Sequence, residues 1–270
     1  MITFGTCSWN YDSWINVVYT AKSSHSAGYL KEYARKYRTV EVDSWFYKIP
    51  TESEVDEYLS YVDPGFTFSC KLTESITLTH LRGKEDTNPV FLSPELFNQY
   101  TSAIAKLIPQ LFVIEMEFEY LNKQKMASLE VFLDSMDRFL TRIKTPLSLA
   151  IETRNSNYIK PEYFQFLKDH NLTHVFSEKL YMPPIYEVYE KFGHMLNDKV
   201  VVRLLGGDRK TIETTTKENW NQLVDEKTNL PVIVDMFKDI DARGKLLNVY
   251  VNNHYEGSAP LTIEKIKGMI

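Results

Sequence analysis

The chain has 270 residues, a formal net charge of −5, 43% apolar residues and 25% charged residues. This is the composition of an ordinary globular protein, and its mild acidity argues against a broad electrostatic surface for nucleic acid. The chain has no run of about 18 apolar residues and its start lacks the pattern of a signal peptide, so we expect a cytoplasmic protein without a membrane segment.

Eight short segments rich in β-branched and aromatic residues alternate with longer stretches whose apolar spacing fits helices. The predicted strands are Ile2–Thr6, Thr39–Asp43, Phe66–Lys71, Leu111–Glu117, Pro146–Glu152, Thr173–Ser177, Lys199–Leu205 and Leu246–Asn252. The predicted helices are Ser26–Arg38, Thr51–Val62, Ser93–Leu107, Lys123–Ile143, Lys160–His170 and Thr214–Asp225. This alternation predicts an α/β fold over residues 1–270, a single (β/α)8 TIM-type barrel with a parallel eight-stranded core and outer helices. A doubly wound open sheet is the alternative.

Polar side chains collect toward the carboxyl ends of these predicted strands. Residues two apart in a strand share a face, which places Glu41 beside Asp43 in the second strand. Lys71 and Glu152 end the third and fifth strands, and Arg203 lies near the end of the seventh. Loops at this end build the active sites of such barrels, so we expect a functional site there. The alternative is a structural ion-pair network that closes the mouth of the barrel.

Six blocks of the sequence follow the order and spacing of a known family. They are Gly5–Trp9, Glu41–Pro50, Phe66–His80, Glu152–Arg154, Arg203–Gly206 and Asn252–Ala259. In turn they resemble the patterns Gly-Thr-Ser-Gly-Trp, Glu-Ile-Asn-Ser-Thr-Phe-Tyr-Arg-Leu-Pro, Phe-x-Phe-x-x-Lys with Thr-His, Glu-x-Arg-His, Arg-Leu-His-Gly and Asn-Asn-His-x-x-Gly-x-Ala. These patterns are those of the YecE-like family, also called domain of unknown function 72. The resemblance covers nearly the whole chain and implies a TIM-barrel fold, without implying a particular reaction.

The sequence departs from the family patterns at three places. Asn155 stands where the family usually has histidine, and Leu205 replaces the histidine of the Arg-Leu-His-Gly block. Glu115–Glu119 replaces the usual Gln-Leu-Pro-Pro. A mechanism that needs those two histidines is therefore not expected in this protein.

The segment after the seventh predicted strand suggests an anion site. Arg203 precedes Gly206 and Gly207, and barrels commonly bind phosphate in the loops after strands seven and eight. Glycine N–H groups with Arg203 as a bidentate cation would bind an anion, and Lys71 and Arg154 would add positive charge. The alternative is that the glycines only permit a tight turn while Arg203 pairs with a glutamate.

Aromatic residues crowd the same end of the predicted barrel. They are Trp9, Trp45, Phe46, Tyr47, Tyr158, Tyr181 and Tyr255. Such rings stack on bases or sugars, although most are expected to pack between the barrel and its loops. Trp9 and Tyr47 are the first candidates for ligand contact. The full set of predicted ligand-binding residues is Arg203, Gly206, Gly207, Arg154, Asp43, Asn252, Asn253, Trp9, Tyr47 and His80.

Candidates for proton transfer lie among the same blocks. His254 and Glu152 lead, because imidazole titrates near neutrality and apolar walls would raise the pKa of a buried glutamate. Glu41 and Lys71 are further catalytic candidates, and Glu178 is a reserve. A structural, hydrogen-bonded His254 is the alternative.

The sequence specifies no cofactor, and a divalent metal is the alternative. The available donors are Glu41, Glu152, Glu178, His80 and His254. No local metal-binding motif occurs, and Lys71 and Arg203 would compete for the carboxylates. Cys7 and Cys70 form no CxxC pair and are expected to be reduced, buried thiols.

The leading functional hypothesis is an enzyme that binds a small phosphate-bearing ligand, such as a nucleotide, sugar phosphate or phosphodiester, at the carboxyl ends of the strands. A phosphodiesterase-like hydrolase and an isomerase both fit this hypothesis. The alternatives are a metal-assisted hydrolase or isomerase and a non-catalytic module that binds a ligand or single-stranded nucleic acid.

Overall fold

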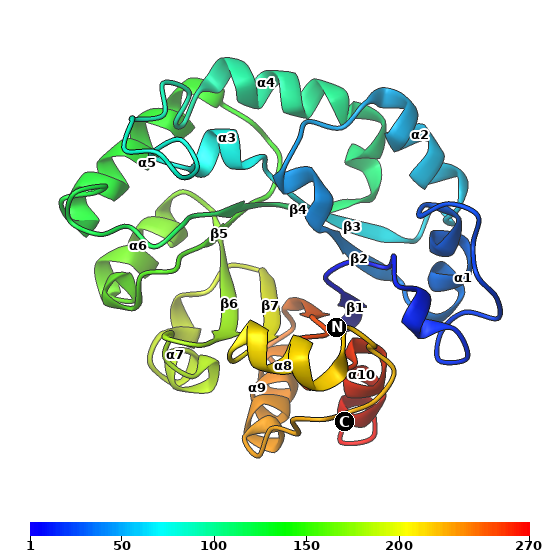
Figure 1. Cartoon of the computed structure of the whole chain (residues 1–270). Helices are drawn as coiled ribbons and strands as arrows, with labels where there is room; N and C mark the ends of the chain where they lie inside the picture. Colours follow the sequence, from blue (N-terminus) through cyan, green and yellow to red (C-terminus); the bar gives the residue numbers. More distant parts are fainter.

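The computed structural model describes residues 1–270, in which helices surround a ring of parallel strands (Figure 1). The strands are β1 (Ile2–Thr6), β2 (Thr39–Val42), β3 (Thr67–Lys71), β4 (Leu111–Glu117), β5 (Leu149–Glu152), β6 (Thr173–Lys179), β7 (Lys199–Gly206) and β8 (Leu246–Val251). All hydrogen-bonded neighbours are parallel, in the order β1-β8-β7-β6-β5-β4-β3-β2. The predicted (β/α)8 barrel is confirmed, and the open-sheet alternative is not what forms.

The helices follow the strands as crossovers on the outside of this ring. They are α1 (Gly28–Lys36), α2 (Glu52–Ser60), α3 (Glu74–Thr77), α4 (Pro94–Ala103), α5 (Leu129–Ile143), α6 (Pro161–Asp169), α7 (Ile185–Phe192), α8 (Arg209–Thr216), α9 (Leu230–Ala242) and α10 (Ala259–Lys267). Short 3-10 helices are η1 (Asp12–Trp14), η2 (Asp43–Phe46), η3 (Ala105–Gln110), η4 (Ser156–Tyr158) and η5 (Gly193–Met195). None of these helices combines the length and the apolar character that crossing a membrane requires.

The predicted helix Thr214–Asp225 is largely wrong. The helix of this region begins earlier, because Asp208 caps it by accepting the N–H of Lys210 at 3.1 Å. It ends at Thr216, because Lys217 and Glu218 both adopt positive φ angles of 51° and 58°.

The interior of the barrel is filled by side chains, as its size requires. One layer consists of Cys7, Val113, Ala150, Val175, Val201 and Tyr250 with Phe112. The Tyr250 hydroxyl lies 2.7 Å from Ser69 Oγ and 2.9 Å from Thr39 Oγ1, which satisfies its polar end. Cys7 and Cys70 are free and buried, as predicted, with Cys70 on the outer face of β3. The barrel interior is therefore a packed core and not a pore, and the charged residues at the carboxyl ends of the strands lie above this core.

A seam separates β1 from β2, where no backbone ladder forms. A Cβ added to Gly5 would lie 2.3 Å from the carbonyl oxygen of Thr39, so glycine permits the close approach of the two strands. The Tyr33 hydroxyl bridges the seam: it accepts from the Thr6 N–H at 2.9 Å and donates to the Thr39 carbonyl at 3.0 Å. A side chain of α1 thus replaces a missing backbone bond.

Tyr33→Phe is expected to lower the free energy of unfolding by about 2 kcal/mol, because the buried Thr6 N–H loses its acceptor. Tyr37→Phe is the matched control, since its ring lies 4.7 Å from that of Tyr33 but its buried hydroxyl has no hydrogen-bond partner. Its removal is expected to change stability little. Urea unfolding followed by circular dichroism measures both, and equal losses would contradict the bridging role of Tyr33.

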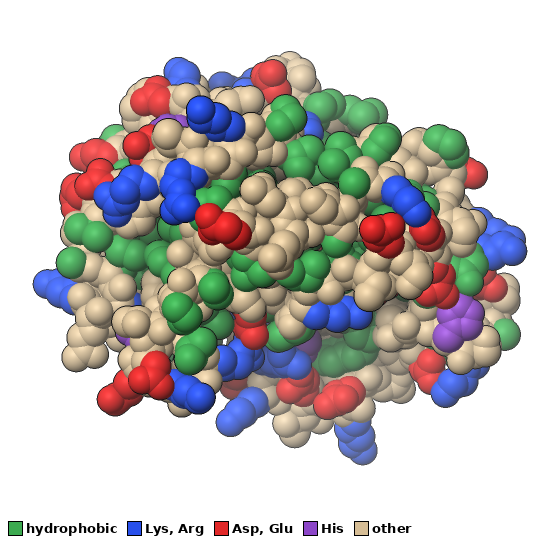
Figure 2. Space-filling view, turned by 90° about the horizontal axis from the view of Figure 1, so that it is seen from above, with side chains coloured by type: hydrophobic (Ala, Val, Ile, Leu, Met, Phe, Trp, Pro, Cys, Tyr) green, Lys and Arg blue, Asp and Glu red, His purple; other side chains and the backbone are tan.

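Charges of both signs alternate over the face seen in Figure 2, and no broad patch of one sign covers it.

Candidate active site

Eight charged side chains gather at the carboxyl ends of the strands, and we call this group the mouth cluster. Its members are Glu41, Asp43, Lys71, Glu115, Glu117, Glu152, Arg154 and Arg203. The sequence predicted six of them. Glu115 and Glu117 were missed as site residues, although they share one face of β4 with inward-facing Val113 and lie where the sequence departs from its family pattern.

Arg203 lies at the centre of the mouth cluster and is only 2% exposed. Its guanidinium holds Glu41 through two hydrogen bonds of 2.7 Å, one from Nε and one from Nη2. Its Nη1 donates to Glu152 at 2.5 Å and to Glu117 at 3.3 Å. Every guanidinium nitrogen therefore already donates to a carboxylate, as the structural ion-pair alternative expects.

The other two cations connect the remaining carboxylates. Lys71 Nζ lies 2.8 Å from Asp43 Oδ1 and also contacts Glu117. Arg154 lies 2.8 Å from oxygens of both Glu117 and Glu152. The side chain of Asp43 is 36% exposed and that of Glu117 is 17% exposed, whereas Glu152 is fully buried. Asp43 and Glu117 are therefore the carboxylates that solvent or a ligand reaches.

The carboxyl groups of the cluster differ in acidity. Burial raises the pKa of Glu115 well above its usual value, because Arg203 offsets only part of the desolvation. Burial also acts on Glu117, but Lys71 and Arg154 outweigh it and bring its pKa to about 2. The pKa values of these two neighbouring carboxyl groups are therefore shifted in opposite directions, and Glu117 is ionised near pH 7.

The prediction that apolar surroundings raise the pKa of Glu152 is wrong. Burial acts in that direction, but Arg154 and Arg203 outweigh it and hold the pKa of Glu152 well below its usual value. The Ser177 hydroxyl donates a further hydrogen bond of 2.7 Å to the same carboxylate. Burial instead raises the pKa of two other carboxyl groups of the cluster, Glu115 and Glu41.

The carboxylates of Glu115, Glu117 and Glu152 offer oxygens that lie within 4.8 Å of one another, which is a spacing open to a metal ion. Arg154 and Arg203 already neutralise Glu117 and Glu152, so a divalent ion would have to displace two cations. This donor set does not favour a metal centre.

The two glycines after β7 have different surroundings. Gly206 has φ of 85°, and a Cβ there would lie 2.3 Å from the carbonyl oxygen of His254, so the backbone approach requires glycine. Gly207 faces open space. The helix that follows is capped by Asp208, whose carboxylate occupies the position an external anion would take at this N-terminus.

His254 lies beside this loop rather than in the mouth cluster. Its Nδ1 is 2.6 Å from Asn252 Oδ1, and its Nε2 is 3.1 Å from Glu213 of α8. Burial lowers the pKa of His254, with Glu213 opposing the shift. Both ring nitrogens are thus engaged with side chains, as the structural alternative expects.

Three other predicted ligand-binding residues have structural contacts. Asn253 is buried, and its Oδ1 accepts the N–H of Ala259 at 2.9 Å at the start of α10. Trp9 is 5% exposed and packs edge-on against Tyr58 at 5.0 Å between barrel and loops. The Nδ1 of His80 lies 3.0 Å from Thr79 Oγ1.

Of the two remaining predicted residues, Tyr47 lies near the mouth cluster and Glu178 does not. Tyr47 is 62% exposed and packs edge-on against Phe46, whose ring lies 5.2 Å below Lys71 Nζ. Glu178 points away from the interior, where it accepts the N–H of Ile185 at 3.0 Å and a bond from Asn229. Tyr47 thus remains accessible near the cluster, and Glu178 does not reach it.

A pocket of about 530 Å³ opens beside the cluster, and we call it the mouth pocket. Its lining residues are Glu117, Tyr120, Arg154, Ser156, Lys179, Leu180, Tyr181 and Met182. Lys179, at the end of β6, has no carboxylate within ion-pair distance, unlike Arg154 on the same wall. Lys179 is exposed, and partial desolvation together with the neighbouring Arg154 lowers its pKa. Lys179 was not among the predicted site residues, because the predicted strand ended at Ser177.

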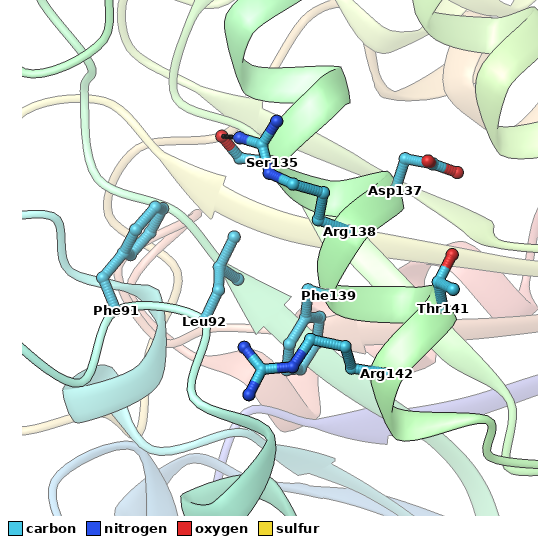
Figure 3. Close-up of a pocket in the computed structure, with 8 residues that line it drawn as sticks. All are labelled: Phe91, Leu92, Ser135, Asp137, Arg138, Phe139, Thr141 and Arg142. Carbon is cyan, nitrogen blue, oxygen red and sulfur yellow. Dashed lines mark hydrogen bonds between the residues drawn. The ribbon is translucent and has the colours of Figure 1, made fainter.

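A second pocket, of about 550 Å³, lies between α5 and the Phe91–Leu92 segment (Figure 3). Arg138 and Arg142 project into it from α5, where Arg138 bonds Ser135 and Arg142 pairs with Glu95. None of its lining residues belongs to the mouth cluster, so it is a separate surface feature.

Comparisons with known proteins agree with this fold. Residues 3–270 match the family profile described as "Protein of unknown function DUF72". A crystal structure of a DUF72 family protein from Enterococcus faecalis V583 superimposes with a TM-score of 0.72 at 20% identity, covering 100% of this chain and 96% of that one. Another, from Thermotoga maritima MSB8, gives 0.69 at 22% identity, covering 100% and 98%. Comparison with the curated proteins gives no match. The sequence match over nearly its full length shows that the chain belongs to the DUF72 family, as the resemblance of its motifs predicted.

Proposed function

We propose that the protein is an enzyme that binds a small phosphate-bearing molecule in the mouth pocket and acts on it by acid–base chemistry. The observation that supports this most directly is Lys179, a cation in the pocket wall without a carboxylate partner. An ammonium group in that position gains a strong, charge-assisted hydrogen bond when an anion arrives. Arg154 lines the same wall, but its guanidinium is already paired with Glu117 and Glu152.

The anion site of this proposal differs from the one predicted at Arg203, Gly206 and Gly207. Arg203 is buried and donates only to carboxylates, and Asp208 caps the helix after the glycines. Lys179 lies in an open pocket whose volume of about 530 Å³ falls in the usual range for small-molecule sites.

Proton-transfer groups adjoin the proposed anion site. Glu117 lines the pocket and is ionised, so it accepts a proton from a ligand bound there. Glu115 is fully buried beside it, burial raises the pKa of Glu115, and one of its carboxyl oxygens lies within 4.8 Å of an oxygen of Glu117 and of Glu152. Glu117 is therefore the carboxylate that contacts the ligand in this proposal, and Glu115 is a buried neighbour whose pKa is shifted the opposite way.

Lys179→Gln is expected to weaken the binding of ribose 5-phosphate about tenfold, because it removes one charged hydrogen bond to the phosphate. Isothermal titration at low salt measures the dissociation constants. Lys168→Gln is the matched control, since Lys168 is exposed on the outer surface of α6 and its loss leaves the affinity unchanged. The proposal is overturned if wild type and Lys179→Gln bind equally, or if neither binds a phosphate ester.

An assay for product formation distinguishes the proposed enzyme from a protein that only binds its ligand. Phosphorus NMR of wild-type protein incubated with a panel of phosphate mono- and diesters is expected to show product, and Glu117→Gln is expected to abolish it while retaining phosphate binding. Binding without product from any member of the panel would favour the non-catalytic alternative. Adding Mn²⁺ or Mg²⁺ to the same reactions tests the metal-assisted alternative, which predicts product only with the ion.

A further inference from the structure

Two tyrosines at the edge of the mouth pocket have large exposed rings. Tyr120 is 63% exposed and Tyr181 is 88% exposed, and both line the same pocket. They follow different strands, β4 and β6, so two separate loops bring an aromatic ring to one opening. A flat, apolar ring left in water at a pocket edge is a common partner for a planar group of a ligand.

The backbone holds Tyr181 in a conformation that tyrosine disfavours. Its φ is 69°, in the left-handed region where the Cβ crowds the following carbonyl group. The turn is closed by a hydrogen bond of 3.1 Å from the Met182 N–H to the Lys179 carbonyl, and the Leu180 N–H binds the Gly206 carbonyl at 3.2 Å. Glycine adopts this conformation without steric strain, so the tyrosine side chain at position 181 lowers the stability of the folded protein.

The loop of Tyr120 is fixed by a buried amide. Asn155 is 1% exposed, and its Oδ1 accepts the Leu121 N–H at 2.7 Å. Its Nδ2 donates to the Leu121 carbonyl at 2.8 Å. Asn155 is one of the departures from the family pattern, and here it anchors the backbone next to Tyr120. The backbone that carries the Tyr120 ring at the pocket edge is therefore held in place by these two hydrogen bonds.

We infer that Tyr120 and Tyr181 form an aromatic rim that stacks on a planar ring of the ligand, so that the substrate class of this site is a mononucleotide. This inference rests on the proposed function, because it places the phosphate of the nucleotide on Lys179. A nucleoside monophosphate joins a phosphate to a flat base within one small molecule, which matches an unpaired cation and two exposed rings around a single pocket.

The test compares adenosine 5′-monophosphate with ribose 5-phosphate, which carries the same phosphate and sugar but no base. Wild-type protein is expected to bind the nucleotide about tenfold more tightly, a ratio that corresponds to about 1.4 kcal/mol. Tyr181→Gly and Tyr120→Ala are each expected to remove most of that preference while leaving the affinity for ribose 5-phosphate unchanged.

Two controls separate lost stacking from lost folding. Tyr181→Gly relieves the left-handed strain, so its melting temperature is expected to equal or exceed that of wild type. Lys144→Gly relieves the same kind of strain at the end of α5, where φ is 43°, and is expected to leave binding of both ligands unchanged.

The outcomes distinguish the aromatic rim from the anion site. Equal affinity of wild type for the two ligands overturns the rim and leaves the anion site standing. A nucleotide preference that survives in both tyrosine variants also overturns the rim. Failure of wild type to bind either ligand overturns the proposed function and this inference together.

Discussion

Arg203→Met is expected to lower the free energy of unfolding by about 3–5 kcal/mol, because it leaves buried carboxylates without their cation. Glu41 loses both of its guanidinium hydrogen bonds, and Glu152 loses the bond of 2.5 Å. Urea unfolding at neutral pH measures the loss. Arg243→Met is the control, since Arg243 pairs with Asp239 on the surface of α9 and the side chain is 52% exposed. Its loss is expected to cost less than about 1 kcal/mol.

A rescue variant checks the cause of this instability. Adding Glu41→Gln to Arg203→Met removes one uncompensated charge, so we expect the double variant to be more stable than Arg203→Met alone. The loss of unfolding free energy in Arg203→Met is also expected to become smaller at acid pH, because the carboxylates that lost their cation take up protons. A loss no larger than that of Arg243→Met would show that the cluster does not depend on Arg203.

Acidification is expected to destabilise the protein through His174 by about 2–3 kcal/mol between about pH 6.5 and about pH 4.5. His174 is buried on the outer side of β6, with its Nδ1 3.2 Å from the Tyr163 hydroxyl and its ring against Phe164 and Phe176. Burial lowers the pKa of His174 to about 3. The native state keeps the imidazole neutral, so the unfolded chain takes up the proton first as pH falls below about 6.5. The stability is therefore complete above that pH and lost progressively below it.

The comparison of wild type with His174→Gln isolates this contribution. The carboxylates titrate alike in both proteins, so the difference between their stability curves reports the histidine. We expect the difference to change by about 1.4 kcal/mol per pH unit below about pH 6. A histidine NMR titration gives an independent check. Parallel stability curves, or protonation of His174 in the native state above about pH 5, would contradict the prediction.

The arrangement of strands could be predicted because its signal is local. The segments Ile2–Thr6 and Leu111–Glu117 were predicted with their observed bounds. In β3, Ser69 and Lys71 lie on the inner face and Cys70 on the outer face, as alternation along a strand requires. Side chains alternate across any strand, so period two in the sequence reports the two faces of the barrel wall. The helix at Thr214–Asp225 was misplaced because a cap at Asp208 and left-handed residues after Thr216 override its apolar spacing.

The positions of the site residues were also predictable, whereas their partners were not. Alternation placed Glu41, Lys71, Glu152 and Arg203 at one end of the barrel, and they meet there. Which cation neutralises which carboxylate depends on distances of a few ångströms between different strands, set by register and side-chain packing. That is why the Arg203 guanidinium is fully engaged, and why burial raises the pKa of Glu115 and Glu41 whereas that of Glu152 is lowered.

By itself, the sequence determined the barrel, its family and the end at which charge collects, because strand period, segment order and motif spacing are properties of the chain. Only the tertiary structure decided which charged side chains of this end pair with one another and that Lys179 stays without a carboxylate partner. Two residues more in β6 than predicted bring Lys179 to the wall of the mouth pocket, beyond ion-pair distance of any carboxylate. Coulomb attraction and desolvation depend on separation and burial, and both are fixed only when distant strands pack together.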